Sequence, residues 1–144
     1  MHQLLGTISW NPRGHVLGII GLSHIRKKLA YEARTAEGMK IHYHEVVQSP
    51  PEVEEELQAT LHPTLHALLA ASDCVTLRMP NILNLVNAEA FATVKTSVRL
   101  ENTTRGQVID QEALIAALSS VKLSAAALDV HYHEPRVSRT LAVM

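Results

Sequence analysis

The chain alternates between short apolar runs and segments of helical periodicity. Five runs concentrate apolar residues and are bounded by glycine, proline or polar residues, which is typical of strands in a parallel sheet. These runs span residues 15–22, 39–45, 74–80, 96–103 and 123–135. Four intervening segments place apolar residues at three- and four-residue steps, which predicts helices. They span residues 24–36, 62–73, 87–95 and 110–122. This order of strands and helices predicts an α/β domain with a mostly parallel sheet, in which the last run is a buried strand followed by a loop.

A few residues mark the expected ends of these elements. Gly38 stands where a helix C-cap belongs, Asp110 is a suitable N-cap, and Pro63 is expected near the first turn of the second helix. Pro80 ends the third strand. The segment 48–56, QSPPEVEEE, is interpreted as a turn with a solvated acidic face, because prolines and like charges dominate it.

Length, charge and cysteine content narrow the class of protein. At 144 residues the chain is long enough for one domain with its own core and short for two. Its formal net charge of −1 offers no basic surface to nucleic acid. The single cysteine, Cys74, is interpreted as a small core residue. No apolar stretch approaches the length of a membrane span, and the first residues lack the pattern of a signal peptide, so we expect a cytoplasmic protein without a membrane partner.

A strand, a glycine turn and a helix open the chain, which is where a dinucleotide-binding fingerprint G-x-G-x-x-G would lie. The six positions from Gly21 are GLSHIR, so the first glycine is present while Ser23 and Arg26 occupy the second and third glycine positions. Both side chains crowd places where backbone should approach phosphate or strand, so we expect weakened cofactor binding. The alternative is that Arg26 turns outward and contacts phosphate. The acid expected about 20 residues further on is Glu45.

The tetrapeptide HYHE occurs twice, at 42–45 and at 131–134. Two histidines at i and i+2 of a strand share a face, and with a carboxylate they could bind zinc. A metal protein is therefore one alternative. We expect no metal site, because the glutamate of each copy has another explanation below and four ligands would have to converge from two strand ends.

Motifs along almost the whole chain resemble one protein family. They are GHVLGIIGL (14–22), GMKIHYHE (38–45), LHALLAASDCVTLRMP (65–80), NTTRGQVID (102–110), EALIAAL (112–118) and KLSAAALDVHYHEP (122–135). In this order and spacing they closely resemble the cofactor domain of the D-isomer-specific 2-hydroxyacid dehydrogenases, which include glyoxylate/hydroxypyruvate reductases and phosphoglycerate dehydrogenases. The family usually has alanine where this chain has Thr104.

The resemblance implies a Rossmann-type, doubly wound sheet with helices on both faces. Residues 1–144 would form a single NAD(P)-binding domain, in which 1–13 are part of a linker or helix. NAD would be preferred over NADP, because a carboxylate at Glu45 repels a 2′-phosphate. The implied cofactor-binding residues are Gly21, Ser23, His24, Ile25, Glu45, Pro80, Thr103, Thr104 and Asp129.

The resemblance also implies two catalytic positions and a reaction. Arg105 corresponds to the arginine that grips the substrate carboxylate, for which a planar guanidinium is suited. Glu134 corresponds to the glutamate that orients the catalytic histidine, and Asp129 to the aspartate near the nicotinamide carboxamide. The implied activity is hydride transfer between NAD(H) and a 2-hydroxy or 2-oxo acid.

The sequence also departs from the family pattern. The catalytic histidine of the family would follow the segment 137–144, and the substrate domain is absent, so we expect this truncated chain to be impaired or inactive as an enzyme. Glu101 replaces an aliphatic residue, and Arg78 replaces a residue that is usually histidine. The alternative function is a non-catalytic dimerisation or interaction module, with a homodimer as the expected assembly.

Overall fold

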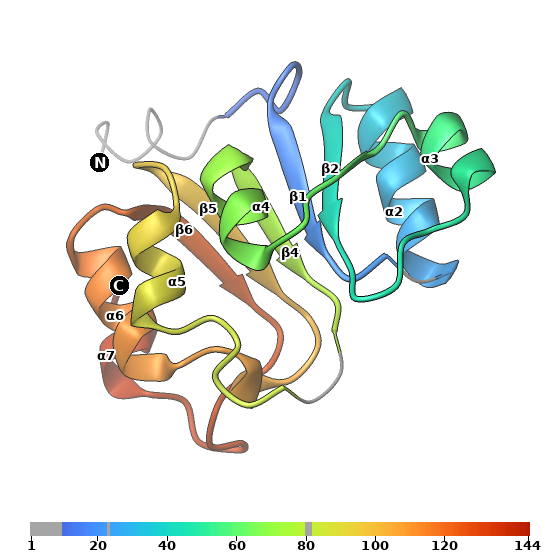
Figure 1. The fold of residues 1–144 in the computed structure, drawn as a ribbon. Helices are drawn as coiled ribbons and strands as arrows, with labels where there is room; N and C mark the ends of the chain where they lie inside the picture. Colours follow the sequence, from blue (N-terminus) through green and yellow to red (C-terminus); the bar gives the residue numbers. More distant parts are fainter. Residues whose placement is uncertain (1–9, 23, 80–81) are drawn as a thin grey trace.

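Six strands, all parallel, form one sheet in the computed structural model, which describes residues 10–22, 24–79 and 82–144 (Figure 1). The spatial order is β3-β2-β1-β4-β5-β6, so the chain begins in the middle and builds outward in both directions. This is the doubly wound order of dinucleotide-binding folds, and it confirms the predicted fold class. The strands are β1 (Val16–Ile20), β2 (Lys40–His44), β3 (Thr60–Leu61), β4 (Cys74–Leu77), β5 (Val98–Asn102) and β6 (Leu123–Leu128).

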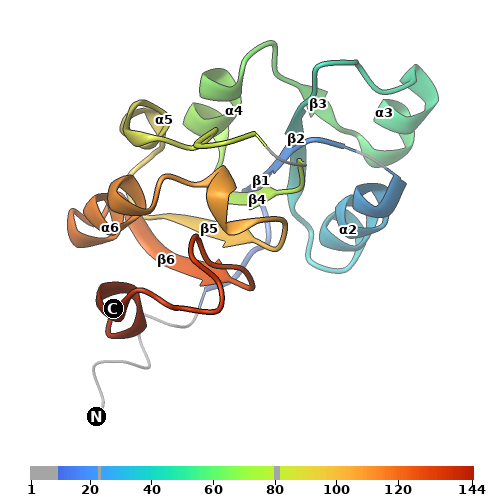
Figure 2. The same cartoon turned by 90° about the horizontal axis from the view of Figure 1, so that it is seen from below.

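Helices cover both faces of this sheet. Figure 2 shows α4, α5 and α6 on one face and α2 and α3 on the other, over β1 and β2. Among the described residues, no helix is long and apolar enough to cross a membrane. The helices are α2 (His24–Thr35), α3 (Pro51–Leu57), α4 (Leu65–Ala71), α5 (Ala88–Thr93), the 3-10 helix η1 (Gly106–Val108), α6 (Gln111–Ser119) and α7 (Arg139–Ala142).

The central strand β1 contributes residues to two hydrophobic cores, one on each face of the sheet. Leu17 and Ile19 pack with α2 and β2, whereas Ile20 points to the opposite core under α4. Gly18, between them, faces the end of α4, where a Cβ would overlap the hydroxyl of Ser72. The apolar run of β1 is therefore continuous because both faces are buried, and its glycine allows α4 to approach closely.

Backbone and side-chain caps set several helix boundaries. Gly38 has φ +68° and its N–H donates to the carbonyl of Arg34 (3.1 Å), which is the predicted C-cap of α2. Asp110 accepts a hydrogen bond from the N–H of Ala113 (3.0 Å), as predicted for an N-cap. Pro63, expected near the first turn of α4, lies directly before Thr64, which is the N-cap of that helix, so the proline precedes the helix.

The segment interpreted as a solvated turn contains a helix. α3 begins at Pro51 and buries Val53 and Leu57 against the core of β1 and β2. The i, i+4 spacing of these two residues outweighs the surrounding charges, and a proline is well tolerated at the first helical position. Glu54 from the same helix accepts a hydrogen bond from the hydroxyl of Tyr43, a fully buried side chain of β2.

For the last run, 123–135, the expected strand followed by a loop is confirmed, but the expected burial of that strand was wrong. Among the described residues β6 is at one edge of the sheet, and Ser124, Ala125 and Ala127 are exposed. Leu123 is the one fully buried residue of β6, while Ala126 and Leu128 contact the core under α6. Half of the residues of β6 are alanines, which an exposed face of an edge strand tolerates, so the apolar composition of this strand does not by itself show that it is buried.

A cluster of charged and aromatic side chains joins the amino ends of the strands. Asp73 accepts hydrogen bonds from the backbone N–H of Val16 (2.8 Å) and from Lys95 Nζ (2.8 Å), and lies 3.5 Å from His15 Nδ1. The guanidinium of Arg99 lies 4.3 Å from the ring centroid of Trp10. These contacts fix the start of β1 to the start of β4. They lie at the amino ends of the strands and do not involve the carboxyl ends.

Candidate functional site

The turn after β1 is joined to the end of β2. Gly21 has φ +84°, a conformation that favours glycine, and its N–H donates to the carbonyl of His44 (2.8 Å). Glu45 Oε2 accepts a hydrogen bond from the N–H of Leu22 (2.8 Å). The acid singled out in the sequence therefore lies directly against the glycine turn. Ser23 lies outside the described residues, as do the side chains of His24 and Ile25.

The loops around this turn carry exposed apolar side chains. Val46 and Val47 follow Glu45 and are 81% and 76% exposed. Ile82 and Leu83, in the loop after β4, are also exposed, and Pro80 of that loop lies outside the described residues. The turn lies at the carboxyl end of β1, between β2 and β4, where the strand order reverses. In open α/β sheets this is where ligands bind.

Buried polar atoms without partners gather near the carboxyl ends of β4 and β5. They are Thr76 Oγ1, Arg78 Nε and Thr103 Oγ1, with Asn84 Oδ1 in the loop that follows β4. A buried polar group without a hydrogen bond costs about 1–3 kcal/mol, so a bound group or an ordered water that supplied the missing partner would be stabilising here. Together with the glycine turn and Glu45, these residues fit a polar dinucleotide lying across the carboxyl ends of the strands.

The loop after β5 is organised by one buried side chain. Asn102 is 1% exposed; its Oδ1 accepts from the N–H (3.1 Å) and the hydroxyl (2.8 Å) of Thr104, and its Nδ2 donates to the carbonyl of Arg105 (3.0 Å). The exposed guanidinium of Arg105 donates to the carbonyl of Thr104 (2.7 Å). Asn102 thus fixes the backbone from which Arg105 projects.

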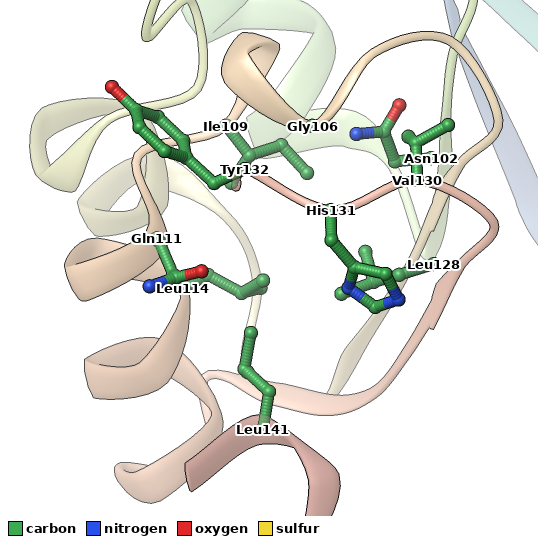
Figure 3. Close-up of a pocket in the computed structure, with 10 residues that line it drawn as sticks. All are labelled: Asn102, Gly106, Ile109, Gln111, Leu114, Leu128, Val130, His131, Tyr132 and Leu141. Carbon is green, nitrogen blue, oxygen red and sulfur yellow. The ribbon is translucent and has the colours of Figure 1, made fainter. Parts of the chain in front are cut away.

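Gly106 brings this loop against the segment after β6. A Cβ at Gly106 would overlap the carbonyl of His131 and the backbone nitrogen of Tyr132. Only a glycine allows so close an approach of two backbones. Figure 3 shows His131 beside Gly106, with its ring turned toward Leu128 and away from Tyr132. The contact explains how Arg105 and Glu134, 29 positions apart in the sequence, come to line one groove.

The groove has a volume of about 440 Å³. Its lining consists of Arg105, Gly106, Gln107, His131, Tyr132, His133 and Glu134. Glu134 Oε1 accepts a hydrogen bond from the N–H of His131 (2.9 Å), which holds the carboxylate at the turn. Asp129 is exposed at the end of β6, where its N–H donates to the carbonyl of Asn102 (3.0 Å). A guanidinium and a carboxylate facing one groove can bind an anionic substrate and position a proton-transfer group.

Asn102, Gly106 and His131 organise this site, although none of them was predicted from the sequence as a site residue. Two of them lie within the motif NTTRG itself, on either side of the residues that received roles. A buried asparagine at a strand end and a glycine directly after a functional arginine are signals that could have identified them.

The two HYHE copies make different contacts. In the first, His42 Nδ1 lies 3.0 Å from His62 Nε2, and His44 Nδ1 lies 3.0 Å from the carbonyl oxygen of His62. In the second, Glu134 is tied to the backbone of His131. Within the described ranges, no group of three or more histidine, cysteine or acidic side chains is placed to hold a metal ion.

Comparison with known proteins gives a family model that covers almost the whole chain. The model is that of the D-isomer specific 2-hydroxyacid dehydrogenase, NAD binding domain, and it matches residues 4–143. Among curated proteins, 4-methyl-2-oxopentanoate reductase A of Aspergillus oryzae is 36% identical over 94% of this chain and 41% of its own length. Glyoxylate reductase 1 of Saccharomyces cerevisiae is 33% identical over 94% of this chain and 39% of its own.

Solved structures give the same result. The apo form of D-mandelate dehydrogenase from Rhodotorula graminis has a TM-score of 0.95 and 44% identity, over 99% of this chain and 42% of that one. A glyoxylate reductase structure from Paecilomyes thermophila has a TM-score of 0.86 and 36% identity, over 93% of this chain and 40% of that one. The chain therefore spans about two fifths of the length of each of these four relatives.

Proposed function

Because this chain belongs to the D-isomer specific 2-hydroxyacid dehydrogenase family and corresponds to its NAD-binding domain, we propose that it binds NAD(H) and supplies half of a site for hydride transfer to a 2-oxo acid. The observation that carries the proposal is the shared groove of Arg105 and Glu134, brought together by Gly106. This groove lies at the same carboxyl ends of the strands as the glycine turn and Glu45.

Glu45 would select the cofactor. Its carboxylate accepts hydrogen bonds from the N–H groups of Leu22 and Val46, and it would also accept hydrogen bonds from the ribose hydroxyls and repel a 2′-phosphate. The apolar side chains of Val46 and Val47 directly follow it and would cover one side of the adenine. These contacts favour NAD(H) over NADP(H).

The chemical roles at the groove would be divided between two charged residues. The nicotinamide, when bound, supplies or accepts the hydride. Arg105 would bind the carboxylate of the substrate with two N–H groups and hold its carbonyl carbon at a fixed place. Glu134 is fixed by the hydrogen bond that it accepts from the N–H of His131. It would orient the imidazole of the catalytic histidine, which the family resemblance places after the segment 137–144, and that imidazole would transfer the proton to the carbonyl oxygen. We expect the isolated chain to be impaired in catalysis.

Isothermal titration with NADH and NADPH tests the proposal. We expect NADH to bind the 144-residue chain, with NADPH at least about tenfold weaker, a difference of about 1.4 kcal/mol. An Arg105→Ala variant is expected to bind NADH normally and to lose binding of oxamate, a 2-oxo acid analogue, in the presence of NADH. If NADH does not bind, the proposed function is wrong, whereas if NADPH binds as well as NADH, only the proposed role of Glu45 is wrong.

A second candidate function is self-association, favoured by the face of β5 and β6 over which the described residues place no helix. Ala125 and Ala127 are exposed on this face, so a second chain could approach the backbone closely. We expect a homodimer through this surface. Analytical ultracentrifugation of the chain and of an Ala125→Glu/Ala127→Glu variant tests it; equal sedimentation of the two proteins contradicts it.

A further inference from the structure

Two departures from the family pattern meet in the structure. Arg78 directly follows β4, and its Nη2 lies 3.3 Å from Oε1 of Glu101 in β5. In the sheet, Thr76 lies opposite Glu101, so the two charged side chains project from neighbouring strands on the same face. The arginine and the glutamate that depart from the family pattern thus form one ion pair.

The backbone places Arg78 next to the glycine turn. Its N–H donates to the carbonyl of Ile20 (3.1 Å), the last residue of β1 before Gly21. The arginine is therefore rooted at the strand end that neighbours the turn, on the side of β4 and β5. Helix starts and glycine turns of this kind are where the phosphates of a dinucleotide bind.

The ion pair with Glu101 orients the guanidinium of Arg78, but it does not occupy all of the hydrogen-bond donors of that group. The side chains of Arg78 and Glu101 are only 26% and 34% exposed. Arg78 Nε is buried without a partner among the described residues, and the neighbouring Thr103 Oγ1 is in the same state. A guanidinium has five N–H donors, and a single contact with Glu101 leaves others available. Buried donors without partners point to a ligand with anionic oxygens.

We propose that Arg78, oriented by Glu101, binds the pyrophosphate of the dinucleotide. This inference rests on the proposed NAD(H)-binding function and adds a residue to it. The chain has Ser23 and Arg26 where the fingerprint has its second and third glycines, so fewer close backbone contacts to phosphate are expected at the turn. A guanidinium from the neighbouring strand end offsets that loss by a charge-assisted contact.

Titrations with ADP-ribose, which carries the pyrophosphate, and adenosine, which does not, test this role. Binding is followed by NMR chemical shifts, which detect weak as well as tight ligands. For Arg78→Ala we expect ADP-ribose binding about 10- to 100-fold weaker, as for loss of a charged hydrogen bond, and adenosine binding changed by less than about twofold. Affinity for ADP-ribose should also depend less steeply on salt than in the unsubstituted chain.

Three further variants separate a ligand contact from a structural one. Glu101→Gln releases the guanidinium and should weaken ADP-ribose binding in the same direction, by a smaller factor. Arg78→Lys keeps the charge and should retain the salt dependence, and it stands in for Arg78→Ala if that variant does not fold. Arg99→Ala is the matched control, because it removes one arginine from the same face of β5 at the amino end, where Arg99 contacts Trp10.

The outcomes distinguish this inference from the function on which it rests. If the unsubstituted chain binds ADP-ribose and Arg78→Ala leaves that affinity unchanged, or weakens both probes equally, the role of Arg78 is refuted while NAD(H) binding stands. If the unsubstituted chain binds neither NADH nor ADP-ribose, the proposed function fails and the inference fails with it.

Discussion

The carboxylate of Glu45 accepts a hydrogen bond from the backbone N–H of Leu22 at 2.8 Å, which links the end of β2 to the glycine turn after β1. Because this carboxylate is also the proposed ribose acid, its charge should set cofactor preference. Glu45→Gln is expected to weaken NADH binding and strengthen NADPH binding, changing their affinity ratio about tenfold, or about 1.4 kcal/mol. Isothermal titration measures both. Glu55→Gln, an exposed position of α3, is the control of equal charge change; an equal effect on both nucleotides in Glu45→Gln would contradict the prediction.

Gly106 should be intolerant of any side chain. In Gly106→Ala the new methyl group meets backbone atoms of His131 and Tyr132, which cannot move aside as a flexible side chain would. We expect a loss of about 1–3 kcal/mol in the free energy of unfolding, together with weaker oxamate binding because Arg105 and Glu134 separate. Urea unfolding followed by circular dichroism gives the first quantity. Gln107→Ala, at an exposed position of the same 3-10 helix, should stay within about 0.5 kcal/mol. Unchanged stability of Gly106→Ala would show that the loops do not press on each other.

Asp73 should make folding stability depend on pH in the acid range. Partial burial raises the pKa of Asp73, but hydrogen bonds from Lys95 and from the N–H of Val16 outweigh it and hold the pKa below its usual value of 3.8. A lowered pKa contributes stability above pH 3.8, and that contribution is lost as the pH falls toward the folded-state value. Asp73→Asn should therefore cost about 1–3 kcal/mol at pH 7 and unfold with a flatter pH dependence below pH 4. Urea unfolding at several pH values measures it, and parallel curves for both proteins would exclude the mechanism.

His42 should act in a higher pH range than Asp73 but in the same direction, so that stability is again lost as the pH falls. Burial and the neighbouring ring of His62 lower the pKa of His42 below 6.5. Lys95 and Lys40 shift it the same way, while Asp73 opposes them. The unfolded chain then binds a proton that the folded chain resists, so stability falls as the pH drops from 6.5 toward the folded-state pKa.

The matching variant is His42→Gln, which cannot be protonated. We expect its thermal midpoint to change less between pH 7 and pH 5 than that of the unsubstituted chain, by differential scanning calorimetry. His66→Gln, at an exposed position of α4, provides the comparison. An identical pH dependence in all three proteins would exclude His42 as the cause.

The sequence was sufficient for the sheet and its long helices, because their patterns are set by burial. β1 is apolar at every position because both of its faces are covered, and Gly38 marks the end of α2 because only a positive φ fits there. α3 and β3 were not predicted from the sequence, for two different reasons. In α3 two buried residues are set among prolines and glutamates, and the two-residue β3 is too short to show any period.

The site was only partly accessible to sequence reasoning. Motif positions indicated Arg105 and Glu134 individually, but their shared groove depends on a backbone contact at Gly106 that no side-chain pattern records. Arg78 and Glu101 each looked like an isolated departure, because cross-strand neighbours are far apart in the sequence. Pairing between strands becomes visible only when the register of β4 and β5 is known.

The contact between Arg99 and Trp10 has a practical consequence for spectroscopy. Trp10 is the single tryptophan of the chain, and it stands beside His15 and under a guanidinium at the amino ends of the strands. A five-residue strand is about 16 Å long, so the indole is roughly that far from the carboxyl ends where ligands are expected. Its fluorescence therefore reports on the integrity of the opposite end of the sheet, and a titration that leaves its emission wavelength constant has not unfolded the protein.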